Sequence, residues 1–191
     1  MPPRTPPLPR PALEPARISI DIRQLSADDV DAVLPALVQL LIEVVGSGTP
    51  MGFLPPLSRE AGGKYFQALR PELSANSRIL LAAFAAGRLI GTGQLMLSPW
   101  SNSPHRAELQ KIVVASDRRG HGIGALLLHA LHAEARRRGR SLLMLNTRHG
   151  SPAQRLYQRF GYDVAGLVRG YMRDAEGRRY DSVMMVRDGA G

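Results

Sequence analysis

Residues 117–124 read Asp-Arg-Arg-Gly-His-Gly-Ile-Gly, and this segment constrains the fold of the chain more than any other. An apolar run at 112–114 precedes it and an Ala/Leu-rich run at 125–131 follows it, which predicts a strand, a tight glycine loop and the start of a helix. Backbone without side chains can approach a ligand closely, and the free N–H groups of a first helical turn attract anions. The segment therefore predicts a phosphate-binding loop, with guanidinium groups from Arg118 and Arg119 beside it.

The glycine spacing distinguishes three kinds of phosphate loop. A mononucleotide P-loop ends in Gly-Lys-Ser/Thr, but an alanine follows Gly124, so that class is excluded. A dinucleotide-binding loop has an acidic residue about 20 positions further on, where this chain has the apolar run 143–145. The remaining pattern is Arg-x-x-Gly-x-Gly, formed by Arg119, Gly122 and Gly124. It resembles the pyrophosphate motif of the GNAT superfamily of N-acetyltransferases, whose ligand is acetyl-CoA.

A second block strengthens this resemblance. Residues 151–162 open with Ser151, a good N-cap, and Pro152, which suits a first helical position. The Leu-Tyr-x-x-x-Gly-aromatic ending of the block resembles the helix after the fifth strand of GNAT proteins, and it implies that Tyr157 is the general acid toward the CoA thiolate. The resemblance covers roughly residues 17–188. It implies an α+β domain with a mixed, mostly antiparallel central sheet flanked by helices.

A narrower resemblance, to the tabtoxin-resistance branch of the superfamily, rests on the short runs 51–54, 106–111 and 169–171. Two positions depart from the expected pattern. Gly150 stands where the tyrosine helix often opens with an Asn that contacts CoA, and Asn146 stands where the branch has an acidic residue. Asn146 can orient a substrate by hydrogen bonds but cannot take up a proton.

Periodicity and capping signals predict the element order βααβββαβαββ in a single domain, residues 17–191. Strands are expected at 17–24, 79–86, 88–97, 106–114, 142–147, 163–172 and 179–186. Helices are expected at 26–45, 58–74 with a break near Pro71, 122–138 and 151–159. Residues 1–16 hold seven of the 15 prolines, so we expect an extended, flexible tail there.

Acetyl transfer to an amine needs a base for the amine, a donor for the developing oxyanion and an acid for the thiolate. Glu108 is the candidate base, directly or through water, because it is the only acidic residue in the strand before the glycine loop. A salt bridge to Lys111 or Arg106 is its competing structural role, and Glu108 can also serve only to bind substrate. The acceptor site is expected to include Glu43, Met51, Phe53 and Asn146. Phe53 either covers the site or fills the core.

The resemblance also assigns a set of residues to acetyl-CoA. In GNAT proteins, N–H groups of the strand before the loop bind the pantetheine arm and polarise the thioester carbonyl, and the loop holds the pyrophosphate. The acetyl-CoA contacts predicted in this way are Ile112, Val113, Val114, Arg118, Arg119, Gly120, His121, Gly122, Ile123, Gly124, Ala125 and Ser151.

The composition limits the remaining function classes. The chain has no cysteine, which excludes disulfides, thiolate metal sites and a cysteine-bound acyl intermediate and is compatible with a cytoplasmic protein. The longest apolar run, 79–86, is too short to span a bilayer. The net charge is +9, but we expect the arginine cluster at 136–140 to be a solvated helix end rather than a nucleic-acid site. His129 and His132 are expected at the surface, with no metal.

The first functional hypothesis is an acetyl-CoA-dependent N-acetyltransferase that modifies the primary amine of a small molecule, such as an amino acid-like toxin, an antibiotic or a metabolite. Transfer would be direct, in a ternary complex. Two alternatives stay open: a protein N-acetyltransferase of the same fold, and a non-catalytic acyl-CoA-sensing or nucleic-acid-binding module. The sequence does not favour a membrane or nucleic-acid partner, and it leaves a homodimer open.

Overall fold

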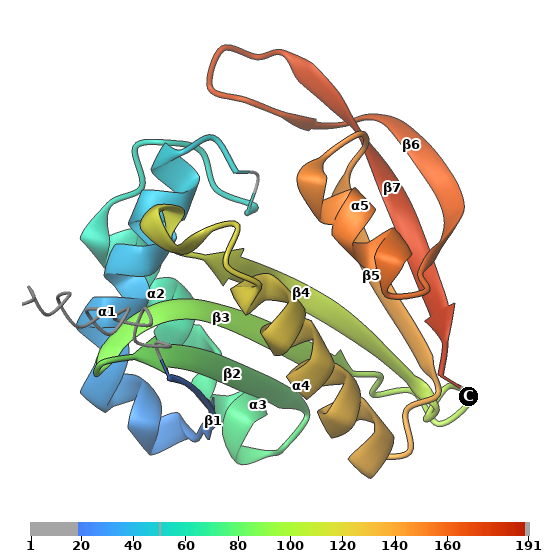
Figure 1. The fold of residues 1–191 in the computed structure, drawn as a ribbon, viewed down its shortest axis with the longest axis horizontal. Helices are drawn as coiled ribbons and strands as arrows, with labels where there is room; N and C mark the ends of the chain where they lie inside the picture. The colour runs from blue at the N-terminus through green and yellow to red at the C-terminus, as the bar shows by residue number, and fades with distance from the viewer. Residues whose placement is uncertain (1–18, 50, 190–191) are drawn as a thin grey trace, which may run out of the picture.

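The computed structural model describes residues 19–49 and 51–189. Within them, seven strands form one sheet in the order β1-β2-β3-β4-β5-β7-β6 (Figure 1), and every neighbouring pair except β4 and β5 is antiparallel. The strands are β1 (Ile20–Leu25), β2 (Arg78–Ala85), β3 (Arg88–Leu97), β4 (Arg106–Val114), β5 (Leu142–Arg148), β6 (Asp163–Arg173) and β7 (Arg179–Asp188). The helices are α1 (Ala27–Gly46), α2 (Arg59–Ala68), α3 (Arg70–Ser74), α4 (Ile123–Arg137) and α5 (Pro152–Arg159), with a 3-10 turn η1 (Ser116–Arg118).

This mixed, mostly antiparallel sheet flanked by helices confirms the predicted α+β class. The predicted tail, residues 1–16, and the predicted start of the domain at residue 17 lie outside the described residues. No helix in the described part of the chain is long and apolar enough to cross a membrane.

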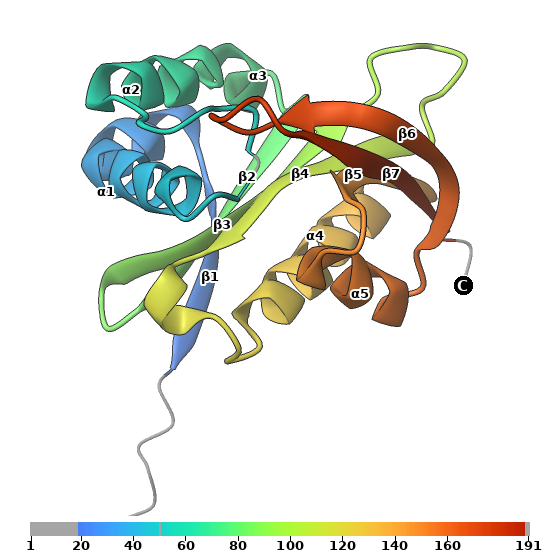
Figure 2. The same cartoon turned by 90° about the horizontal axis from the view of Figure 1, so that it is seen from above.

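The helices divide between the two faces of the sheet, as Figure 2 shows. Helices α1, α2 and α3 cover one face, here called the α1 face, and α4 and α5 cover the other, here called the α4 face. Each face has its own cluster of buried apolar side chains. All eight residues of β2 are buried, because this strand lies inside the sheet with helices on both sides.

Capping residues fix where the helices begin. Ser26 and Asp29 form a capping box at the start of α1, and Ser58 and Ser151 cap α2 and α5. The predicted break in the second helical segment is also present, but it lies at Leu69 rather than at Pro71. Proline is tolerated in the first turn of a helix, where its missing N–H has no partner to lose, so α3 begins just before it.

Two glycines in β3 set how closely α4 approaches the sheet. A Cβ at Gly91 would lie 2.8 Å from the carbonyl oxygen of Val113 and 3.1 Å from Leu127, and a Cβ at Gly93 would lie 2.9 Å from Leu131. Real side chains do not come that near, so only glycine allows this packing. The close approach holds the N-terminus of α4, and the glycine loop before it, against the centre of the sheet.

Candidate functional site

A β-bulge interrupts β4 at Lys111. Thr92 and Gln94 of β3 are two residues apart, but their partners on β4, Val113 and Gln110, are three apart. Lys111 lies in the longer stretch, and its φ is 50°. The extra residue reverses the alternation of side chains: Leu109, before the bulge, packs in the cluster on the α4 face, whereas Val113, after it, packs in the cluster on the α1 face. A lysine in this left-handed conformation is uncommon and costs about 1–2 kcal/mol, so the surrounding structure must hold it in place.

The parallel strands β4 and β5 separate beyond their first few residues. Only 106–108 of β4 pairs with 142–144 of β5, after which β4 pairs with β3 alone and β5 with β7 alone. Figure 1 shows the two strands diverging. The second half of β4 therefore keeps backbone hydrogen-bonding groups that face no neighbouring strand on its β5 side. Such groups need partners when they are covered, and this edge is where residues 112–114 were predicted to bind the thioester.

The glycine loop has the geometry expected for an anion site. Gly122 is the N-cap of α4 in the left-handed conformation, with φ of 78°, and no side chain caps the helix. The first turn of α4 carries no acidic residue, and space is open where side chains would stand on Gly120 and Gly122. The N–H groups of Ile123 to Ala125, in the first turn of α4, have no acceptor within the helix and lie at the positive end of its dipole, so the residues present fit a pyrophosphate.

The two arginines of the loop are engaged with protein groups. Arg119 donates from Nε to the carbonyl oxygen of Val114 at 3.3 Å and from its terminal nitrogen to Oγ of Ser47 at 3.1 Å. Arg118 lies beside Asp117, with 3.5 Å between Nε and the carboxylate. Arg119 thus ties the loop to the C-terminal end of α1, a role that the sequence did not reveal.

Further contacts fix the turn that leads into the loop. The carboxylate of Glu43 accepts a hydrogen bond from the backbone N–H of Ser116 at 2.6 Å. Asp117 accepts two from Arg88, at 2.6 and 3.1 Å. Glu43 was predicted at the acceptor site, and the structure places its carboxylate against η1. The ring of His121 also contacts the backbone of the loop, because its Nδ1 lies 2.9 Å from the carbonyl oxygen of Arg119.

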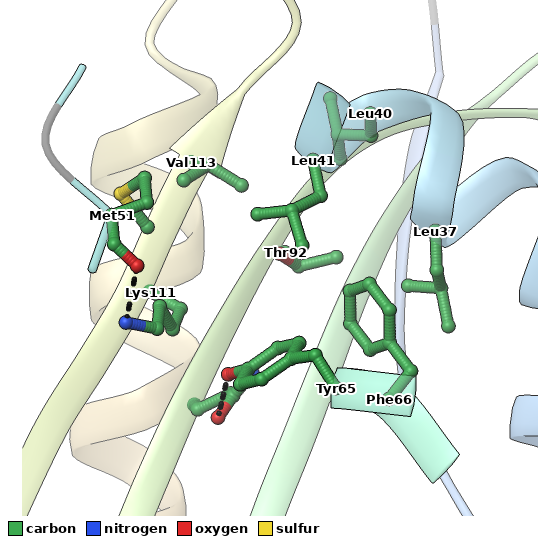
Figure 3. Close-up of a pocket in the computed structure, with 10 residues that line it drawn as sticks. Leu37, Leu40, Leu41, Met51, Tyr65, Phe66, Thr92, Lys111 and Val113 are labelled. Atoms are coloured by element: carbon green, nitrogen blue, oxygen red, sulfur yellow. Dashed lines mark hydrogen bonds between the residues drawn. The ribbon is translucent and has the colours of Figure 1, made fainter. Parts of the chain in front are cut away.

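Two predicted acceptor residues, Met51 and Phe53, meet around Lys111 on the α1 face. The ammonium of Lys111 donates to the carbonyl oxygen of Met51 at 2.7 Å, as Figure 3 shows. It lies 5.9 Å from the ring centroids of both Phe53 and Tyr65. Phe53 and Tyr65 contact each other edge to face. Beside them is a cavity of only about 10 Å³, near the minimum for one water. Phe53 is partly exposed, so it contributes to the surface of the site as well as to its packing.

Glu108 lies on the same face and is held by an amide rather than by a cation. Gln110 donates from Nε2 to Oε1 of Glu108 at 3.1 Å. Within the described residues Glu108 forms no ion pair within 4 Å, so the salt bridge to Lys111 or Arg106 is absent. The orientation of the amide is fixed in turn, because Oε1 of Gln110 accepts from Arg78 at 2.9 Å.

Arg78 is the centre of this polar network. It is 8% exposed and donates to Glu72 at 2.7 Å and to the side-chain oxygens of Gln94 and Gln110 at 2.9 Å each. Gln94 then donates to the hydroxyl of Tyr65 at 2.9 Å. A buried cation with satisfied hydrogen bonds is stable, and here it orients both the candidate base and a ring beside Lys111.

Tyr157 lies on the opposite, α4 face of the sheet and is 8% exposed. Burial raises the pKa of its hydroxyl to about 12, so the group is a neutral donor throughout the range in which proteins are assayed. Its ring contacts that of Tyr162, whose hydroxyl pairs with Nε2 of His132 at 2.8 Å. His132 is buried, so its predicted surface position was wrong. Its ring packs against those of Phe160 and Tyr162, in the turn between α5 and β6.

Asn146 and Ser151 occupy different parts of the site. Glu108 pairs with Met144 in the parallel register, so Asn146, two residues further along β5, lies on the same face as Glu108. It is exposed and stands beyond the point where the strands separate. The hydroxyl of Ser151 accepts from the N–H of Gln154 at 3.1 Å, which confirms its predicted role as a helix cap.

Sequence reasoning missed the residues that surround the predicted base. Lys111, Tyr65, Gln94, Gln110 and Arg78 were not among the candidates. A usable signal was the polar residue inside an apolar strand: Gln94 is 1% exposed between apolar neighbours of β3, and such a residue needs a buried partner.

A family model and a curated relative each match part of this chain. The model of the acetyltransferase (GNAT) family matches residues 49–162. A streptothricin acetyltransferase from Streptomyces lavendulae is 36% identical over 94 residues, which cover 49% of this chain and 48% of that protein. The chain thus spans about half the length of this curated relative.

Solved structures agree in fold. An N-acetyltransferase from Staphylococcus aureus Mu50 superposes with a TM-score of 0.73 at 20% identity, covering 89% of this chain and 98% of that one. The structure of yncA from Salmonella typhimurium, which holds its cofactor acetyl-CoA, has a TM-score of 0.71 at 18% identity, covering 91% and 95%. At these identities the likeness shows the fold alone. The family model, however, matches more than half of the chain and includes both the glycine loop and the Tyr157 helix, so the chain belongs to the GNAT family of acetyltransferases.

Proposed function

We propose that this protein transfers an acetyl group from acetyl-CoA to the primary amine of a small molecule, directly, in a ternary complex. The observation that carries the proposal is the opening between β4 and β5, which lies next to an uncapped helix N-terminus with a glycine loop. One end can hold a pyrophosphate, and the other can hold an extended chain by backbone hydrogen bonds. The streptothricin acetyltransferase among its relatives supports a small amine as acceptor.

The residues around the opening suit the steps of such a transfer. Acetyl-CoA supplies a thioester, whose carbonyl carbon an amine can attack. Glu108 takes the proton of the amine, directly or through water, or holds the amine in place. N–H groups at 112–114 donate to the carbonyl oxygen, on which charge develops. The buried hydroxyl of Tyr157 donates its proton to the leaving sulfur.

Nothing in the arrangement favours the other hypotheses over this one. A protein N-acetyltransferase would use the same opening with a peptide on the α1 face. Assays with peptides and with small amines as acceptors distinguish the two activities. The arginine cluster that raised nucleic-acid binding is partly neutralised, because the carboxylate of Glu134 pairs with Arg137 and Arg138. The narrower resemblance to the tabtoxin-resistance branch stays a prediction.

The first experiment measures the melting temperature with and without acetyl-CoA. A ligand at about 100 times its dissociation constant adds roughly 2.7 kcal/mol, which corresponds to about 5–10 °C for a domain of this size. We expect that shift with acetyl-CoA and none with NAD or ATP. No shift would reject the cofactor assignment. A shift without acetylation of any amine or peptide would favour the non-catalytic acyl-CoA-binding module.

A further inference from the structure

Lys111 is a half-buried cation that uses little of its hydrogen-bonding capacity within the described residues. Its ammonium has three N–H donors, and residues 19–49 and 51–189 provide one acceptor, the carbonyl oxygen of Met51 at 2.7 Å. The ring centroids of Phe53 and Tyr65 lie 5.9 Å from the ammonium, which contacts these rings only through their faces. Figure 3 shows its ammonium pointing to the carbonyl oxygen of Met51, in the segment that follows α1. Lys111 remains partly exposed, so a ligand can reach it.

The described residues do not neutralise this charge. Lys111 forms no ion pair within 4 Å among residues 19–49 and 51–189. The nearby carboxylate, Glu108, is bonded to Gln110. Burial and the cation of Arg78 lower the pKa of Lys111, and Glu108 only partly opposes them. A desolvated ammonium next to a second cation is unfavourable by itself, and an anion placed beside it would relieve that cost.

An anion bound at Lys111 would lie in the predicted acceptor site. Lys111 lies on the same strand as Glu108, three residues away, and it contacts the segment of Met51 and Phe53 that was predicted to face the acceptor. The bulge turns its side chain to the α1 face, the face that also carries Glu108.

We propose that Lys111 forms an anion-binding subsite that holds a carboxylate of the acceptor while its amine lies near Glu108. The acceptor class is then an amine that also carries a carboxylate, such as an amino acid. This inference rests on the proposed function for the identity of the ligand as an acceptor, but the anion site itself can be tested without acetyl transfer.

The direct test uses the lysine content of the chain, which is limited to Lys64 and Lys111. Protein labelled with [ε-13C]lysine gives two side-chain signals, and the variant Lys64→Arg assigns them. Lys64 is an internal control, because its side chain is 76% exposed on α2 and pairs with Glu60. The probes are sodium acetate, acetamide and sodium phosphate, each compared with sodium chloride at equal ionic strength.

We expect acetate to raise the pKa of Lys111, because a bound carboxylate stabilises the ammonium. The signal of Lys64 should be the same in acetate as in chloride. Acetamide should change neither signal. Equal responses of the two lysines to acetate would overturn the subsite. An effect of phosphate on Lys111 without one of acetate would also overturn it, because the anion would then be a phosphoryl group such as those of CoA.

The kinetic test compares each amino acid with its amide, for example L-lysine with L-lysinamide, which differ in the carboxylate. We expect kcat/KM to favour the acid by on the order of 10- to 100-fold. Lys111→Met should abolish that preference, Lys111→Arg should retain most of it, and the control Lys64→Met should not change it. Acetylation of acid and amide at equal rates would refute the subsite.

The two proposals can fail separately. If acetate binds selectively at Lys111 but no amine is acetylated, the subsite stands and the proposed activity fails. If amines are acetylated without regard to a carboxylate and the two lysines respond alike, the activity stands and the subsite fails.

Discussion

Single side chains decide how the candidate site can carry protons. Glu108 accepts a hydrogen bond from an amide whose orientation Arg78 fixes, so its carboxylate is held without being neutralised by a neighbouring cation.

Replacing Glu108 by Gln should therefore separate chemistry from binding. The amide has nearly the same shape and can still accept from Gln110, but it cannot take up a proton. We expect turnover to fall by about 10²- to 10⁴-fold and the pH–rate profile to change, with acetyl-CoA affinity nearly unchanged. Steady-state kinetics across pH and calorimetric titration with acetyl-CoA test this. Unchanged turnover would show that Glu108 is not the base.

The Tyr157→Phe variant tests the acid in the same way. It keeps the packing of the ring against Tyr162 and removes one hydroxyl. We expect kcat to fall by on the order of 10²-fold, with a melting temperature close to that of the wild-type protein. Single-turnover measurements report the chemical step directly. A loss below about threefold would reject the assignment of Tyr157 as the general acid.

The sequence indicated Glu108 and Tyr157 as the candidate base and acid, roles that stay predictions, but it did not predict which side chains surround them. Glu108 and Tyr157 stand in recognisable positions of known motifs. Lys111 could not be placed, because the bulge that turns it to the α1 face appears only when β3 and β4 are paired. Arg78 and Gln94 come from strands far from the glycine loop in sequence, so no local pattern connects them with the site.

At the scale of elements, the contact between β3 and α4 depends on glycine. In Gly91→Ala the new Cβ would lie 2.8 Å from a backbone oxygen of β4, and neither strand can move without disturbing the sheet. We expect the free energy of unfolding to fall by about 1–3 kcal/mol, measured by chemical denaturation.

Gly63→Ala is the matched control for this prediction. Gly63 lies in the interior of α2, with nothing within 4 Å of the place where a Cβ would stand, so alanine should raise the free energy of unfolding by about 0.5–1 kcal/mol. A stabilising effect of both substitutions would show that α4 does not pack against β3 as closely as described.

The elements themselves were the most predictable part of the fold. Caps at Ser26, Ser58 and Ser151 stand in the sequence where the helices begin, because capping is a local interaction between neighbouring residues. The order of strands in the sheet, with β7 between β5 and β6, was not predicted, because strand pairing depends on contacts between segments far apart.

For the whole molecule, the pair His132–Tyr162 couples stability to pH. Burial and nearby arginines lower the pKa of His132 from 6.5 to about 4. The unfolded chain therefore binds more protons than the folded one between these values, so the free energy of unfolding falls as pH drops through that window. At pH 5 the loss attributable to His132 is about 2 kcal/mol relative to neutral pH.

The variant His132→Gln isolates this effect. The amide can still pair with the hydroxyl of Tyr162 but does not titrate. We expect the free energy of unfolding of the variant to depend less on pH between 7 and 5 than that of the wild-type protein, as measured by denaturant titration at each pH. Identical slopes for the two proteins would contradict the burial of a neutral imidazole.

The contacts of Glu43 and Ser47 with the turn before α4 limit how this molecule can be recombined with its relatives. Residues 26–74 carry most of the α1 face, so exchanging them is the obvious way to graft a new specificity onto an unchanged glycine loop. Glu43 holds the N–H of Ser116 and Ser47 holds the guanidinium of Arg119. A chimera that omits either would release the loop from the inserted segment, so a workable graft must carry both residues with it.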